Sequence, residues 1–409
     1  MSGCNNVNVE PTVIGGGDGS PAYDAFGRLR VSNPLTIFDS KNVMSKNSLF
    51  DESLTNSGTV SYTANKSTVN LNVTTASGDK VIRQSKRVMS YQPGKSLLIF
   101  NTFVMNTQEE NLEQRVGTFD ANNGIFFEDY GTGYRFVRRT YTSGSPADTD
   151  VNQSSWNGDK LDGTGPSGYT LLPTKATILF TDYEWLGMGA VRCGFVIDGK
   201  FIVAHTFYNA NNLDTVYMQT ANLPIRYEIE TTGTISGAAS LQQVCSSALI
   251  EGGYAPQGIQ QMIGTASLGG VNLTTAGTFY NLATISLQSS RPYAVIVSQG
   301  FDASAVSNSD FEVQLRLNAT PSTAFSYTTY SDNVKYDLTG TTTITGGTII
   351  GKAYLSGKAS NSIQFGDGFN FDYQLGQTIA GSSDTLTLCA KGGSNGDDIC
   401  GTLKWVDLT

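Results

Sequence analysis

Apolar residues in this chain recur at every second position, and this period is that of a half-buried β-strand. In the stretch 59–75, Val69, Leu71 and Val73 alternate with polar residues. No window of twelve residues has the spacing of an amphipathic helix, and the stretch 246–253 has room for one helical turn at most. The 45 glycines, 19 tyrosines and 20 phenylalanines favour short strands joined by turns. The sequence therefore predicts an all-β fold.

The segment GFVIDGKFIVAH, residues 194–205, predicts a β-hairpin. Asp198 and Gly199 stand between two apolar runs, and this dipeptide tolerates the positive φ angles that a two-residue turn requires. We therefore expect the strands on either side of it to pair with each other.

The strand candidates fall into two groups on either side of the turn-rich segment EGGYAPQG, residues 251–258. We predict two β-sandwich domains of jelly-roll-like form, at residues 46–250 and 266–409, with a linker at 251–265. Residues 1–45 are predicted to be an extended N-terminal docking arm. They hold too few apolar side chains to offset the entropy of ordering their backbone.

Charge and composition exclude several classes of partner. The net charge is −9, whereas a nucleic-acid-binding surface needs clustered Lys and Arg. No segment reaches the roughly 18 apolar residues of a membrane-spanning helix. The first ten residues lack the basic start and apolar run of a secretion signal. We therefore expect no nucleic acid and no membrane as partners, and synthesis in the cytoplasm without a signal peptide.

The five cysteines are too few and too widely spaced for a disulfide framework, and no C-x-x-C pair is present to bind zinc. Cys389 and Cys400 flank a turn-rich loop. Two reduced core thiols are the expectation for a protein made in the cytosol, and a pair that faces each other across a hairpin is the alternative. Asp120, Asn122 and Gly124 miss the spacing of a calcium loop by one position. The sequence predicts no metal and no cofactor.

The candidate catalytic groups are incomplete. His205 is the one histidine and lies in an apolar run, where a hydrogen-bonded core or edge residue is expected. Glu228 and Glu230 are two apart on one predicted strand, so their Cβ atoms share a face about 6.5–7 Å apart, a separation that glycoside hydrolysis can use. Asp182 and Glu184 form a similar pair. The first pair breaks the longer Glu-x-Asp-x-x-Glu signature of β-sandwich glucanases, and we predict no catalytic residues and no enzymatic activity.

The tryptophans offer one candidate for binding. Trp156 lies in the polar loop 152–168, where an exposed indole would stack on a sugar, so it is the candidate glycan contact. The alternative is that Trp156 anchors the loop as its one large apolar residue. Trp185 and Trp405 lie in predicted strands and are expected in the core.

The segment AYDAFGRLRVSNPLTIFDSK, residues 22–41, resembles the N-terminal segment of virion structural proteins from tailed bacteriophages, particularly marine and cyanobacterial phages. LPIRYEIE at 223–230, CSSALIEGGY at 245–254 and DDICGTLKW at 397–405 extend this resemblance. The strand order of the first sandwich is also similar to that of a concanavalin or laminin-G jelly roll. The resemblance implies a non-enzymatic virion component present in many copies, as a capsid decoration, a neck or tail adaptor, or a fibre.

The resemblance gives the N-terminal arm a role. The arm would attach the protein to other virion proteins, with Tyr23 and Phe26 as buried anchors, Gly27 allowing close approach, and Arg28 and Arg30 pairing with an acidic surface. A homo-oligomer within the virion is expected. Two alternatives stay open: the arm folds back on its own sandwich, or the protein is a receptor-binding or glycan-degrading tail spike that acts on host surface polysaccharide.

Overall fold

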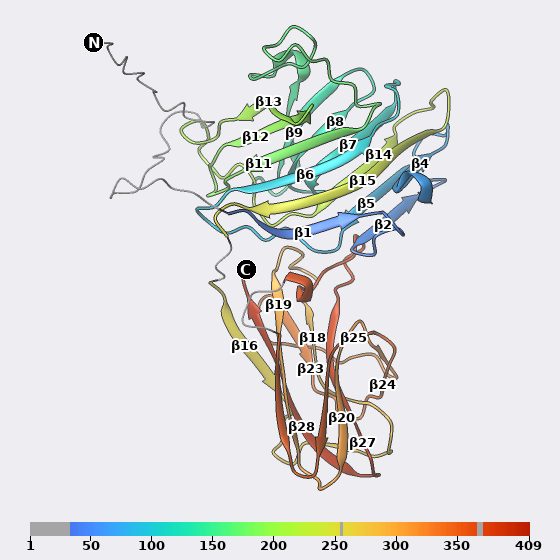
Figure 1. Cartoon of the computed structure of the whole chain (residues 1–409), viewed down its shortest axis with the longest axis vertical. Helices are drawn as coiled ribbons and strands as arrows, with labels where there is room; N and C mark the ends of the chain where they lie inside the picture. Colours follow the sequence, from blue (N-terminus) through green and yellow to red (C-terminus); the bar gives the residue numbers. More distant parts are fainter. Residues whose placement is uncertain (1–32, 254–256, 366–370) are drawn as a thin grey trace, which may run out of the picture.

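The computed structural model describes residues 33–253, 257–365 and 371–409. Within these ranges the regular secondary structure is almost entirely antiparallel strand (Figure 1). The helical segments among the described residues are three short 3-10 turns, which are η1 (Ala64–Lys66), η2 (Gln153–Ser155) and η3 (Phe371–Tyr373). The predicted all-β fold of two β-sandwiches is confirmed.

Two antiparallel sheets build the first sandwich. In spatial order, the eight-stranded sheet contains β13 (Lys200–Phe207), β12 (Val191–Ile197), β11 (Thr177–Tyr183), β6 (Leu97–Val104), β15 (Ala239–Ile250), β4 (Thr68–Val73) and β3 (Thr59–Thr63), with β1 (Leu35–Lys41) paired to β15. The seven-stranded sheet contains β10 (Ala147–Asn152), β9 (Tyr134–Thr140), β8 (Gly124–Asp129), β7 (Leu112–Phe119), β14 (Ile225–Thr231), β5 (Lys80–Ser85) and β2 (Phe50–Thr55).

Neighbouring strands in these sheets come from distant parts of the chain. β6 pairs with β15, and β7 pairs with β14, which places strands more than 100 residues apart side by side. One hydrophobic core fills the space between the two sheets. This order, with long connections between paired strands, is that of a jelly roll.

The predicted hairpin is confirmed. β12 and β13 pair in an antiparallel register, joined by Asp198 at φ 50° and Gly199 at φ 72°. Both residues have the left-handed backbone that a two-residue hairpin turn requires.

β1 corrects the predicted extent of the arm. Residues up to 45 were assigned to it by composition, but β1 pairs along β15, and its Ile37 and Phe38 lie in the core of the first sandwich. A β-bulge between Thr36 and Phe38 lets two successive side chains turn inward. β15 continues to Ile250 between β1 and β6, so the stretch 246–250, where we allowed for one helical turn, is strand.

Two further antiparallel sheets and a short ribbon build the second sandwich. The five-stranded sheet contains β16 (Ile259–Gly264), β28 (Asp397–Asp407), β19 (Ile296–Ala305) and β26 (Ser360–Gln364), with β17 (Val271–Leu273) paired to β28. The six-stranded sheet contains β22 (Thr328–Thr329), β23 (Val334–Asp337), β18 (Tyr280–Leu287), β27 (Thr385–Gly392), β20 (Asp310–Leu317) and β25 (Thr348–Ser356). The ribbon pairs β21 (Thr320–Pro321) with β24 (Ile344–Thr345).

The structure excludes the alternative that Cys389 and Cys400 face each other across a hairpin. Cys389 lies on β27 and Cys400 on β28, and these strands belong to different sheets of the second sandwich. The loop between them therefore crosses from one sheet to the other instead of closing a hairpin within one sheet. Both cysteines are free thiols, and burial raises the pKa of the Cys389 thiol to about 12.

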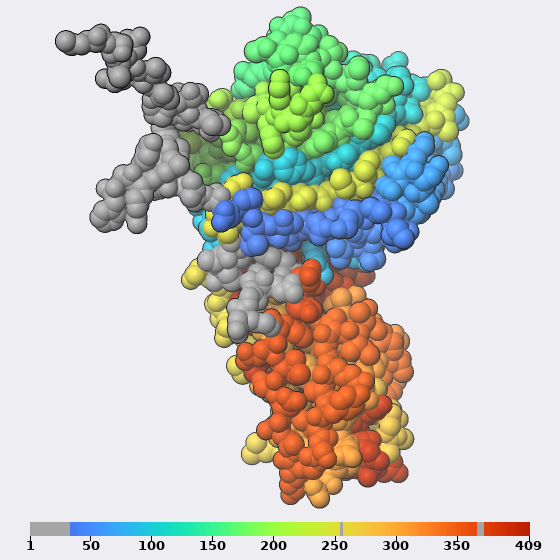
Figure 2. All heavy atoms as spheres, in the orientation of Figure 1, coloured from blue at the N-terminus to red at the C-terminus, as the bar shows by residue number. Residues whose placement is uncertain are grey.

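The two sandwiches are joined end to end by apolar and polar contacts (Figure 2). The Tyr293 hydroxyl donates a hydrogen bond to Asp120 at 2.5 Å, and the Gln377 backbone N–H donates to the Lys86 carbonyl at 2.8 Å. These contacts link two loops of the second sandwich to the first sandwich. One loop lies just before β19, and the other lies between β26 and β27. A small apolar cluster lies at the same junction, and its members are Val88, Val295, Val297 and Val406.

We expect two N-terminal deletions to differ in stability. Removing residues 1–32 leaves every described strand intact, whereas removing residues 1–41 also removes Ile37 and Phe38 from the core. Each buried side chain contributes about 1.5–3 kcal/mol, so the longer deletion should lower the free energy of unfolding by about 3–6 kcal/mol more. Urea unfolding followed by tryptophan fluorescence measures this difference. Equal stability of the two truncated proteins would show that β1 adds nothing to the first sandwich.

Candidate functional site

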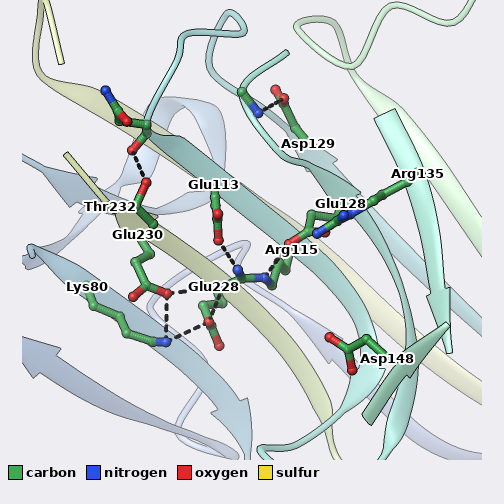
Figure 3. A network of polar contacts seen from close by, with 12 residues as sticks. Lys80, Glu113, Arg115, Glu128, Asp129, Arg135, Asp148, Glu228, Glu230 and Thr232 are labelled. Carbon is green, nitrogen blue, oxygen red and sulfur yellow. Dashed lines mark hydrogen bonds and ion pairs between the residues drawn. The ribbon is translucent and has the colours of Figure 1, made fainter. Parts of the chain in front are cut away.

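The outward face of the seven-stranded sheet carries a dense set of charged side chains (Figure 3). On β14, Tyr227 and Ile229 point into the core, so Glu228 and Glu230 share the opposite face as predicted. Cations from neighbouring strands surround this pair of acids. We call the whole set the charged strip, and its members are Lys80, Glu113, Arg115, Glu128, Arg135, Asp150, Arg226, Glu228 and Glu230.

Arg115 on β7 is the centre of the charged strip. Its Nε lies 2.6 Å from Glu128, and its Nη1 lies 2.7 Å from Glu228 and 3.1 Å from Glu230. Its Nη2 pairs with Glu113 on the same strand. One guanidinium thus joins acids from β7, β8 and β14, and its planar fork allows these simultaneous contacts.

Glu228 is an enclosed acid of the charged strip that meets three cations. Its side chain is 4% exposed and contacts Lys80 at 2.9 Å, Arg115 at 2.7 Å, and Arg226, whose Nε donates at 2.8 Å. Burial alone would raise the pKa of Glu228, but Arg226, Arg115 and Lys80 outweigh it and hold the pKa well below its ordinary value. Glu228 is therefore a permanently ionised carboxylate.

Two further ion pairs extend the charged strip to its ends. At one end, Lys80 lies 2.8 Å from Glu230. At the other end, Arg135 lies 2.7 Å from Asp150 and also pairs with Glu128. Cross-strand pairs of opposite charge stabilise a sheet. The side chains of the charged strip therefore pair with one another across six strands.

Glu228 does not have the properties of the general acid that glycoside hydrolysis needs. A general acid requires a carboxyl group with a raised pKa beside the scissile bond, whereas the pKa of Glu228 is lowered. Burial raises the pKa of Glu113, but Glu113 is itself paired with Arg115. A substrate would have to break several ion pairs to reach either carboxylate.

The sequence analysis missed the cations that define this site. It treated Glu228 and Glu230 as an isolated pair, because nothing in one strand indicates which residues lie on its neighbours. β7, which carries Arg115, was not among the strands identified, although Leu112 and Val116 alternate there with outward charges. That alternation was the available signal.

The second acidic pair is not a pair in the structure. Asp182 lies on β11 and accepts a hydrogen bond from Ser96 while pairing with Arg192. Glu184 lies beyond the end of β11 and is exposed. The strand ends at Tyr183, so the two acids do not lie on one strand as the pairing requires.

His205 is a structural residue, in agreement with the sequence analysis. It is buried on β13 and packs edge-on against Phe207, with ring centroids 4.5 Å apart. The Asn157 backbone N–H donates to its Nδ1 at 3.4 Å, and burial lowers the pKa of His205 to about 4. The imidazole is therefore neutral at physiological pH and holds the 157–159 loop against β13.

Trp156 is not an exposed sugar platform, so its assignment as a glycan contact is wrong. The side chain is 2% exposed, and its Nε1 donates to the Val151 carbonyl at 3.0 Å. The indole packs against Phe136 and Phe195 in the core of the first sandwich. A loop with one large apolar residue gains more by burying it than by exposing it, which is the alternative we had left open.

The other two tryptophans were both expected in the core. Trp405 is fully buried in the second core, as expected, whereas Trp185 is half-buried, with its Nε1 donating to the Met218 carbonyl.

The predicted docking residues lie outside the described part of the chain, and they are Tyr23, Phe26, Gly27, Arg28 and Arg30.

The described residues contain neither a metal-binding cluster nor a membrane-spanning helix. They contain no group of three or more His, Cys, Asp or Glu side chains arranged to hold a metal ion. Among the helices in the same residue ranges, none is long and apolar enough to cross a membrane.

Comparison with known proteins gives only distant likenesses. No protein-family model and no curated protein matches this chain. The legume lectin-like domain from Entamoeba histolytica is similar at 9% identity and a TM-score of 0.30, with 48% of this chain and 89% of that domain covered. The β-glucanase of Bacillus licheniformis is similar at 11% identity and a TM-score of 0.31, with 54% and 99% covered.

The receptor-binding domain of botulinum neurotoxin D is similar at 12% identity and a TM-score of 0.32. The likeness covers 54% of this chain and 50% of that one, so this chain spans about half the length of that domain. TM-scores this low carry no argument about function. The β-sandwich assignment rests on the strand pairing itself.

We expect the stability of the protein to depend on pH through Glu228. Its pKa in the folded state lies below the ordinary 4.5, so the unfolded chain takes up the proton first as the pH falls. The stabilisation is therefore present above pH 4.5 and is lost below it. In Glu228→Gln, the decrease in the free energy of unfolding below pH 4.5 should be smaller than in the wild type. At neutral pH, the free energy of unfolding of this variant should be about 3–5 kcal/mol lower, because buried cations lose their partner.

Urea unfolding at neutral pH and below pH 4.5 measures both effects. Glu113→Gln is the matched control, because the pKa of Glu113 is shifted upward and its contribution to the pH dependence has the opposite sign. This control should keep the full loss at acid pH. An equal acid loss in Glu228→Gln and in the wild type would contradict the assigned role of Glu228.

Proposed function

We propose that this chain is a non-enzymatic structural protein of a tailed-bacteriophage virion, attached to the particle through its N-terminal arm. The resemblance of residues 22–41 to virion proteins supports the location. The proposed partners are other virion proteins, with several copies of this chain in one particle. The protein is synthesised in the host cytoplasm and released in the virion.

The observation that carries the non-enzymatic part is the charged strip. Its acids are all ion-paired, and the side chain of Glu228 is 4% exposed among three cations. Such a network costs desolvation energy and is disrupted by any variant that removes one partner. It therefore supports a face that stabilises a durable sandwich, and it does not support a face that opens to bind and cleave a polymer.

The junction between the sandwiches supports the same proposal. The two sandwiches share an apolar cluster and direct hydrogen bonds, including Tyr293 to Asp120 and Gln377 to Lys86. They also stack along one long axis (Figure 2). A component that spaces or decorates a particle needs such a fixed relation between its two halves.

A second candidate function is binding of host surface glycan without cleavage. The observation that favours it is a polar groove of about 530 Å³ on the five-stranded sheet of the second sandwich. Hydroxyl, amide and charged groups line it, and these are the groups that hydrogen-bond sugar hydroxyls. The residues that would make such bonds are Asp302, Ser360, Asn361, Ser362, Thr402 and Lys404.

We expect the arm to be required for incorporation into virions. A protein lacking residues 1–32 should fold and yet be absent from purified particles, because attachment is lost. Tyr23→Ala combined with Phe26→Ala should weaken docking by about 2–4 kcal/mol, as for buried aromatic anchors. Immunoblots of purified virions measure incorporation. Leu268→Asp, at a 98% exposed loop position, is the control that should incorporate normally. Full incorporation of the deletion variant would disprove attachment through the arm.

We expect no depolymerisation of bacterial surface polysaccharides by the purified protein. Chain length of the polysaccharide after incubation is the measurement, and Glu228→Gln should behave as the wild type does. Cleavage that disappears in Glu228→Gln would establish a glycan-degrading spike and overturn the proposal. Saturable binding without cleavage, weakened at least about tenfold by Asn361→Ala, would instead support the second candidate function.

A further inference from the structure

The outer face of the eight-stranded sheet is apolar over β6, β11 and β13. Antiparallel sheets with one solvated face normally alternate apolar residues inside with polar residues outside. β6 breaks this rule, because Leu97, Ile99 and Phe103 fill the core while alternate residues of the same strand are apolar on the outside. The outward apolar side chains of the three strands are Leu98, Phe100, Ile178, Phe180, Phe201 and Val203.

Phe201 is the centre of this apolar outer face. Its side chain is 59% exposed, although its ring contacts Phe180 and Phe100 with centroids 5.1 and 5.8 Å apart. Exposed aromatic clusters of this kind mark surfaces that another polypeptide covers. The face is therefore incomplete in the part of the chain that the structure describes.

A groove of about 330 Å³ crosses this face and combines apolar walls with acidic groups. Leu98, Phe180 and Phe201 line it together with Asp182 and Glu251. Arg192 pairs with Asp182 at the same groove. The lining carries two acids and one arginine, so its net charge is negative, and the groove fits a segment that combines aromatic side chains with a net positive charge.

The chain enters the sheet beside this groove. Leu35 at the start of β1 pairs with Ile250, which in turn pairs with Leu97. Ser96 immediately precedes Leu97, and Glu251 immediately follows Ile250. Both residues lie at this end of the sheet and line the groove. The residues that precede β1 therefore leave the sheet at the groove's own end. Figure 1 shows β1, β15, β6, β11, β12 and β13 side by side in that order.

We propose that residues 22–32 of this same chain lie across the apolar outer face and fill the groove. Strands are about 4.8 Å apart, and an extended chain advances about 3.3 Å per residue. The five residues from Asn33 back to Arg28 span about 17 Å, which covers the three strand spacings from β1 to β11 and Asp182. The nine residues from Leu35 at the start of β1 back to Phe26 span about 30 Å, which covers the five spacings of about 24 Å to β13 and Phe201.

The chemistry of the segment matches the positions it reaches. Phe26 meets the aromatic cluster around Phe201, and edge-to-face packing is available there. Arg28 meets Asp182. Gly27 between them has no side chain to hold the backbone away from the sheet. Docking within one chain is also favoured by the high effective concentration of a tethered segment.

This inference rests on the proposed function for the arm's role as the attachment device, and it states where the arm lies before attachment. The arm and the apolar outer face cover each other in the free protein.

Trypsin cleavage at Arg28 and Arg30 in the full-length protein tests the proposal. A docked arm is protected, so Phe201→Asp should accelerate cleavage at these two arginines about tenfold or more. Tyr354→Asp is the matched control, because Tyr354 is a similarly exposed aromatic residue on the second sandwich. This control should be cleaved at the wild-type rate. Equal rates in the wild type and Phe201→Asp would overturn the proposal.

A double-mutant cycle guards against damage to the fold. Phe26→Asp lies outside the sandwich and should accelerate cleavage as Phe201→Asp does, while the double variant should be no faster than either single variant. Independent, multiplying effects would contradict a direct contact between the two residues. Protection in the wild type should not change with protein concentration; protection that grows with concentration would assign the groove to the arm of a second copy and overturn docking within one chain.

The outcome is separable from the test of the proposed function. An unprotected arm that is still needed for incorporation into virions overturns only the docking proposal. A protected arm whose deletion leaves incorporation unchanged overturns only attachment through the arm.

Discussion

Each residue of a β-strand must point to one face of its sheet, and the organisation of this protein depends on that constraint. In the first sandwich the inward residues of both sheets form one apolar core. The outward residues are then free to differ between the two sheets. One outer face carries the charged strip centred on Arg115, and the other carries the apolar cluster centred on Phe201. The same core thus supports two surfaces of opposite chemistry.

These two surfaces have different physical consequences. The ion pairs of the charged strip are mutually satisfied, so its face needs no partner and resists one, since binding there would leave buried charges unpaired. The apolar face has the reverse property, because covering it removes apolar surface from water and lowers the free energy of the system. A covering segment is therefore expected on the eight-stranded sheet, and residues 22–32 are the segment that we propose. The jelly-roll topology itself does not decide this, since both sheets belong to the same fold.

The connection between the two sandwiches gives the molecule its length. Backbone and side-chain hydrogen bonds link the first sandwich to two loops of the second, at Tyr293 and at Gln377. β1 brings the N-terminal region into the first sheet next to the groove.

The sequence by itself determined the all-β class, the hairpin at Asp198 and Gly199, and the shared face of Glu228 and Glu230, because these follow from local period and turn chemistry. It left the burial of Trp156 open as an alternative, and it missed the place of β1 in the first sheet. It also left open a pairing of Cys389 and Cys400 across one hairpin, which the structure excludes because they belong to two sheets. Tertiary structure alone decided that Arg115 neutralises the acid pair and that Phe201 joins an exposed cluster, since both depend on strands that are distant in sequence. Local periodicity says which face a residue takes, whereas its neighbours on that face are set only when the sheets assemble.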